Sequence, residues 1–70
     1  MSRVNVAVAV AEDARGRIYE VVAACCALGL QHTATLRDVG VLTGSVEYGT
    51  LPKLWAVPGV VAVELAREFQ

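Results

Sequence analysis

The chain has 70 residues, of which 56% are hydrophobic and 19% are charged, and its formal net charge is −1. A chain of this length buries only about 60% of the surface that its unfolded form exposes. Residues 1–70 are therefore expected to form a single domain that keeps apolar surface for a partner. Six basic and seven acidic residues, without a run of like charge, give no electrostatic basis for nucleic-acid binding.

The sequence also argues against a membrane role. Its longest apolar run, residues 21–30, is shorter than the roughly 20 residues that cross a bilayer, and no secretory signal follows the first residues. Cys25 and Cys26 are adjacent, so they cannot build a disulfide framework, because neighbouring helical residues point about 100° apart. We expect reduced thiols and a cytoplasmic location.

The first two elements differ in their period. Residues 4–10 alternate with a period of two, which predicts a half-buried strand. One face of this strand consists of Val4, Val6, Val8 and Val10, and the other of Asn5, Ala7 and Ala9. The next segment predicts a helix from about Ala14 to Leu28, capped by Glu12 or Asp13 and ended by Gly29. Its core stripe consists of Ile18, Val21, Val22, Cys25 and Leu28.

Residues 30–47 are rich in β-branched side chains and broken at residues 38–40, which predicts an antiparallel hairpin. In its second strand Gly44 lies on the inward face, where it would let a helix pack close to the sheet. A short helix follows, with Thr50 as its cap and Pro52 in its first turn, and Pro58-Gly59 ends it. Residues 60–65 supply a last strand.

The element order is therefore βαββαβ, an α+β arrangement of the ferredoxin-like type, with a four-stranded antiparallel sheet and both helices on one face. The second face of the sheet would stay uncovered. Solvated faces normally carry charged residues, whereas this one is nearly free of charge, which favours protein binding. Its expected residues are Ala7, Ala9, Val41, Thr43, Ser45, Val60 and Ala62.

Catalysis requires titratable groups that converge, and the sequence offers no recognisable set of them. A nucleophile pair of Cys26 and His32 is conceivable, but Cys25 falls on the core stripe of the helix and Cys26 at its margin. These three residues also lack metal-ligand spacing. We expect no enzyme activity, metal or cofactor. Tyr48 and Trp55 could stack on a ligand, although Trp55 has the helical spacing of a core residue.

Two segments carry a family resemblance: "GVLTGSV" at residues 40–46 and "VPGVVAVE" at residues 57–64. With the βαββαβ order, they make the chain similar to the subtilisin propeptide and peptidase-inhibitor family over nearly its whole length. It looks most similar to short stand-alone members, which are often labelled as ketohydroxyglutarate aldolase. A true aldolase of that kind needs a Schiff-base lysine in a large barrel, whereas the single lysine here is Lys53.

The resemblance implies a noncatalytic inhibitor or folding-chaperone-like partner of a subtilisin-type serine protease. In the family the uncovered sheet face packs on protease helices, and the C-terminal tail enters the active-site cleft as a substrate-like peptide. By the resemblance, Glu64 matches an acidic residue that would face a positive helix N-terminus. The implied partner-binding residues are Ala7, Ala9, Val41, Thr43, Val60, Ala62, Glu64, Arg67, Glu68, Phe69 and Gln70.

Two other readings stay open. The uncovered face could pair with itself in a homodimer or with a larger scaffold protein, without any protease target. A small-ligand regulatory domain of the ACT type has the same topology. That class normally places a glycine in the loop after the first strand, which is absent from residues 11–14.

Overall fold

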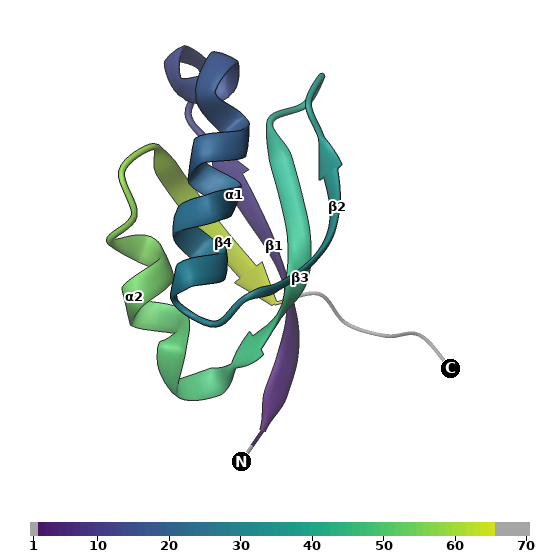
Figure 1. Ribbon diagram of the computed structural model, residues 1–70, viewed down its shortest axis with the longest axis vertical. Helices are drawn as coiled ribbons and strands as arrows, with labels where there is room; N and C mark the ends of the chain where they lie inside the picture. Colours follow the sequence, from purple (N-terminus) through teal and green to yellow (C-terminus); the bar gives the residue numbers. More distant parts are fainter. Residues whose placement is uncertain (1, 66–70) are drawn as a thin grey trace.

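The computed structural model describes residues 2–65 and confirms the predicted ferredoxin-like α+β fold. The elements are β1 (Arg3–Val10), the 3₁₀ helix η1 (Glu12–Arg17), α1 (Ile18–Ala27), β2 (Gln31–Leu36), β3 (Val41–Glu47), the 3₁₀ turn η2 (Tyr48–Thr50), α2 (Leu51–Trp55) and β4 (Val60–Leu65). The four strands form one sheet in the order β2-β3-β1-β4, and every neighbouring pair is antiparallel. Both α-helices lie on the same side of this sheet (Figure 1).

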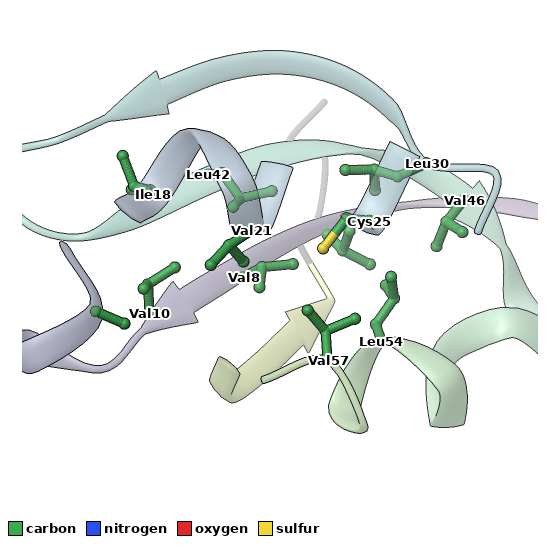
Figure 2. Packing of buried hydrophobic residues seen from close by; sticks show 12 residues of the cluster. Val8, Val10, Ile18, Val21, Cys25, Leu30, Leu42, Val46, Leu54 and Val57 are labelled. Atoms are coloured by element: carbon green, nitrogen blue, oxygen red, sulfur yellow. The ribbon is translucent and has the colours of Figure 1, made fainter. Parts of the chain in front are cut away.

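One hydrophobic core fills the space between the sheet and the helices (Figure 2). β1 and β3 contribute alternate residues to it, as the period of two predicts, and the helices and their loops cover these residues. Every buried side chain within residues 2–65 is apolar or a thiol. The core consists of Val6, Val8, Val10, Ala14, Ile18, Val21, Cys25, Leu30, Leu42, Val46, Leu54 and Val57.

The first helical segment begins differently from its prediction. Residues 12–17 form a 3₁₀ helix rather than α-helix, and neither Glu12 nor Asp13 caps it with a side-chain hydrogen bond. Short 3₁₀ segments are common at helix N-termini, and Gly16 within this one lowers the propensity for α-helix. Thr50 occupies the N-cap position of α2, but its side chain makes no capping hydrogen bond either, whereas Pro52 lies in the first turn as predicted.

The end of α1 matches its prediction. Gly29 has a φ of 105°, a left-handed value that glycine adopts without steric cost. Its N–H donates to Cys26 O at 2.9 Å, and the N–H of Leu30 donates to Cys25 O at 3.1 Å. This pair of hydrogen bonds is the Schellman motif, and it turns the chain so that Leu30 enters the core beside Cys25.

The function of Gly44 in β3 differs from the one expected. A Cβ at this position would collide with the carbonyl oxygen of Gln31 and would lie 3.1 Å from Cγ of Leu30. The close neighbour is therefore the main chain that leads from α1 into β2, not a helix. Because a main-chain carbonyl held in a sheet cannot move away as a flexible side chain can, only glycine fits here.

We therefore predict that Gly44→Ala destabilises the domain by about 1–3 kcal/mol, the usual cost of forcing extra volume into a packed site. The matched control is Gly49→Ala, because a Cβ at Gly49 meets nothing within 4 Å. That variant should stay within about 0.5 kcal/mol of the parent or gain slightly. Urea unfolding followed by circular dichroism measures both. Equal stabilities for the two variants would contradict the assigned role of Gly44.

Candidate protein-binding face

The side of the sheet opposite the helices is called here the open face. In β1 the buried valines alternate with Asn5, Ala7 and Ala9, which point to the uncovered side. Residues directly opposite one another in antiparallel strands point to the same face. The pairing registers therefore extend each of these three β1 residues into a row of neighbours across the open face.

The first row across the open face is entirely apolar. Ala9 pairs with Val41 on one side and with Ala62 on the other, and Val41 pairs with Leu36 at the β2 edge. Leu36 is 52% exposed, a high value for so large an apolar side chain. This row, Leu36–Val41–Ala9–Ala62, forms a flat apolar strip at the end of the sheet nearest the β2–β3 turn.

The next two rows become steadily more polar. The second row is Ala34–Thr43–Ala7–Glu64, and the third is Gln31–Ser45–Asn5. Glu64 is the only charged residue in these three rows, and it is exposed on the edge strand β4. A partner that covered the apolar row and the small residues of the second row would desolvate at most this one charge.

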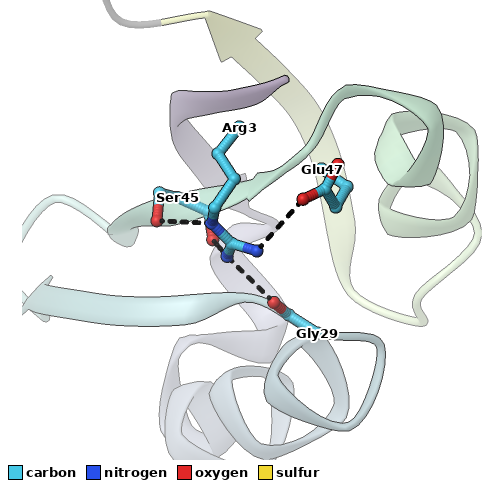
Figure 3. A network of polar contacts seen from close by, with 4 residues as sticks. All are labelled: Arg3, Gly29, Ser45 and Glu47. Atoms are coloured by element: carbon cyan, nitrogen blue, oxygen red, sulfur yellow. Dashed lines mark hydrogen bonds and ion pairs between the residues drawn. The ribbon is translucent and has the colours of Figure 1, made fainter. Parts of the chain in front are cut away.

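Arg3 closes the polar end of the open face (Figure 3). Its Nη2 donates to Ser45 O at 2.8 Å and to Gly29 O at 3.3 Å, and its Nη1 lies 3.7 Å from Oε2 of Glu47. An exposed ion pair of this kind contributes little stability. The two carbonyl contacts nevertheless hold the guanidinium across β3 toward the α1–β2 loop, so its charge is already matched and fixed in position.

One predicted site residue lies on the wrong side. Val60 pairs with Val10, whose side chain is buried under the helices, and Val60 packs against the core. The cause is a β-bulge, because Ala9 pairs with Ala62, which leaves Val61 as the extra residue. A bulge shifts the alternation by one position, so Val60 does not belong to the open face, whereas Val61 is 56% exposed at its edge.

The structure places most of the other predicted residues together. Ala7, Ala9, Val41, Thr43 and Ala62 are half-buried neighbours on the open face. Ser45 and Glu64 lie on the same face, in the rows given above. Four predicted residues fall outside the described part of the chain, namely Arg67, Glu68, Phe69 and Gln70.

The sequence reading missed three exposed apolar residues that border this face: Ala34 and Leu36 on β2 and Val61 on β4. Each lies next to a bulge or beyond one, because β2 carries a second register shift between His32 and Ala34. The alternation of a single strand does not reveal where an extra residue interrupts pairing. A count of large apolar residues at strand ends would have singled out Leu36.

The two cysteines have different surroundings. Cys25 is buried in the core as predicted, and this burial, with a smaller effect of neighbouring Cys26, raises the pKa of the Cys25 thiol. Cys26 is exposed, so the prediction that it packs at the core margin is wrong. His32 forms a 2.7 Å hydrogen bond between its Nε2 and Oγ1 of Thr35, rather than a contact with Cys26.

Trp55 in α2 does not take the core position that its helical spacing predicts, and Tyr48 lies before it in η2. Trp55 is 51% exposed and Tyr48 is 58% exposed, and neither belongs to the core. In the short α2 helix only Leu54 is fully buried, and Trp55, as the next residue, points about 100° away from it around the helix.

Within residues 2–65, no three side chains of His, Cys, Asp or Glu are grouped so that they could hold a metal ion. No helix in the same range is long and apolar enough to cross a membrane. Comparison with known proteins found no matching family model, no similar curated protein and no similar solved structure.

The two thiols should react at very different rates in the folded chain. An aromatic disulfide reagent at neutral pH should modify Cys26 rapidly and Cys25 only after unfolding, because burial both blocks Cys25 and disfavours its thiolate. Folding raises the pKa of the Cys25 thiol, so ionisation of this thiol favours the unfolded chain. The free energy of unfolding should therefore decrease as the pH rises above the pKa of an ordinary thiol.

The single variants provide the controls for this measurement. Cys26→Ser should remove the rapid phase, and Cys25→Ser should leave it unchanged. Two thiols of equal reactivity in the folded parent chain would refute the assignment.

Proposed function

We propose that this chain is a noncatalytic module that binds a subtilisin-type serine protease through its open face, as an inhibitor or folding-chaperone-like partner. The observation that carries the proposal is the uncharged apolar row Leu36–Val41–Ala9–Ala62, on a sheet face that neither α1 nor α2 covers (Figure 1). Antiparallel sheets normally carry polar residues on a solvated face, so an apolar row of this kind marks an interaction surface.

The shape of the open face fits helices on a partner. The central β1 residue of the first row is Ala9 and that of the second row is Ala7. Because both side chains are small, the backbone of an opposing helix can approach closely. The larger Leu36 and Val61 stand exposed near the two edges of the sheet and supply apolar area around that flat centre. Side chains with few rotamers also lose little conformational entropy on binding.

The charged residues at the margin of the open face are also compatible with a protease helix as the partner. Glu64 is exposed at the β4 end of the second row, where it would face the partially positive N-terminus of a protease helix. Arg3 is already paired with Glu47, so it adds no unmatched positive charge. Residues 66–70, which follow β4 in the sequence, would enter the protease cleft, as the family resemblance implies.

We place the target protease in the cytoplasm. Cys25 and Cys26 are both free thiols, and unpaired cysteines suit a reducing compartment. Self-association through the open face, without a protease, is the competing outcome that the experiment below separates.

The test is a titration of the chain into a subtilisin-type protease assay, with Ala9→Arg as the face variant. An arginine at the centre of the apolar row would be buried without a partner, so inhibition should weaken by at least about tenfold. Ala23→Arg adds the same charge on the exposed surface of α1, and this control should inhibit like the parent chain.

A second variant, truncated after Leu65, separates the two parts of the proposed surface. It should lose inhibition but still raise the yield when the protease is refolded with it, because the open face remains intact. An effect of neither kind from the parent chain would refute the protease proposal. Loss of self-association in Ala9→Arg, without any protease effect, would favour the competing outcome.

A further inference from the structure

The sheet has two edges, β2 and β4, and in the described chain each is paired on one side only. An unpaired edge presents a row of main-chain N–H and C=O groups that can pair with another strand. Natural proteins usually protect such edges with charged residues, proline or a bulge. The two edges of this sheet differ in how far they are protected.

β4 is protected in two ways, by the charge of Glu64 and by the bulge at Val61. β2 has the sequence Gln-His-Thr-Ala-Thr-Leu, which contains no acidic residue, no lysine or arginine and no proline. Five of its six residues are exposed. A bulge at Thr33 is its only irregularity, so β2 is the more open edge for pairing.

The bulge gives β2 an unusual distribution of side chains. His32 pairs with Gly44 and Thr35 pairs with Leu42, and both partners lie on the helix side of the sheet. His32 and Thr35 therefore share a face although they are three positions apart, which a regular strand would not allow. The 2.7 Å hydrogen bond between their side chains is consistent with this placement. Gln31 and Leu36 lie together on the open face by the same registers.

This distribution makes β2 complementary to itself. In an antiparallel pair of two β2 strands, Gln31 can lie opposite Leu36 of the partner subunit, and His32 opposite Thr35 of the partner subunit. Each of these pairs joins residues of the same face, as antiparallel pairing requires. Without the extra Thr33, the same register would put the paired residues on opposite faces.

We propose that β2 pairs with β2 of a second copy of this chain about a two-fold axis, which joins the two four-stranded sheets into one continuous sheet. A two-fold contact closes on itself, whereas β2 paired with β4 of another copy would extend without limit. The β2 pair contains no charged carboxylate, ammonium or guanidinium group, whereas β4 paired with itself would place two Glu64 carboxylates in the junction. The dimer leaves the open face of both copies free, so this inference does not depend on the proposed function.

The test is sedimentation velocity of the parent chain from about 5 to 200 μM, with Thr33→Glu as the edge variant. Thr33 is exposed and lies next to the two-fold axis, so two glutamates would approach each other there. The parent chain should form dimers, and the variant should raise the dimer dissociation constant by at least about tenfold. Ala23→Glu makes the same charge change on α1 and should dimerise like the parent.

Two further measurements distinguish this dimer from association through the open face. Amide hydrogen exchange should slow in residues 31–36 as the concentration of the parent chain rises, and should not do so in Thr33→Glu. Ala9→Arg should still dimerise, because Ala9 lies on the open face. A parent chain that stays monomeric at 200 μM, dimers unaffected by Thr33→Glu, or dimers abolished by Ala9→Arg would each overturn the edge pairing.

Discussion

The alternation of valine and alanine along β1 is the constraint on which the rest of this molecule depends. β1 is a central strand that pairs with both β3 and β4, so its two faces set the character of both sides of the sheet. Val6, Val8 and Val10 supply the bulk that the helices cover. Ala7 and Ala9 supply almost none on the other side, and the open face is flat for that reason.

Two bulges then decide what the edges of the sheet present. The bulge at Val61 turns Val60 toward the core and leaves Val61 in solvent. The bulge at Thr33 brings His32 and Thr35 to one face and Leu36 to the other. A bulge interrupts the regular hydrogen-bonded pairing of two strands. Here each bulge places an apolar side chain, Val61 or Leu36, in an exposed position. The open face is thus built by regular alternation at its centre and by irregular pairing at its margins.

The same division explains how far the sequence could predict the structure. The element order and the positions of Ala7, Ala9 and Thr43 follow from periods that are visible within one strand. The placement of Val60 and Leu36 depends on which residues of two strands pair, and no single-strand pattern contains that information. The start of α1 differs from its prediction because Glu12 and Asp13 lie inside the 3₁₀ helix, whose N-cap residue is Ala11, and no side chain caps it. Trp55 matched a helical stripe with Leu51, but Leu54 takes the core position of α2 and Trp55 points about 100° away from it.

The carbonyl of Gln31 that lies against Gly44 has a consequence for how this domain tolerates change. The start of β2 is positioned by Leu30, which lies in the core just before the strand, and by the Gln31 main chain against Gly44, whereas most side chains of the strand itself are in solvent. The path of the strand therefore depends little on the identity of most of its side chains. A foreign recognition sequence grafted onto residues 31–35 should therefore leave the fold intact as long as Leu30, Leu36 and Gly44 are kept, although it would replace the side chains of the proposed edge pairing.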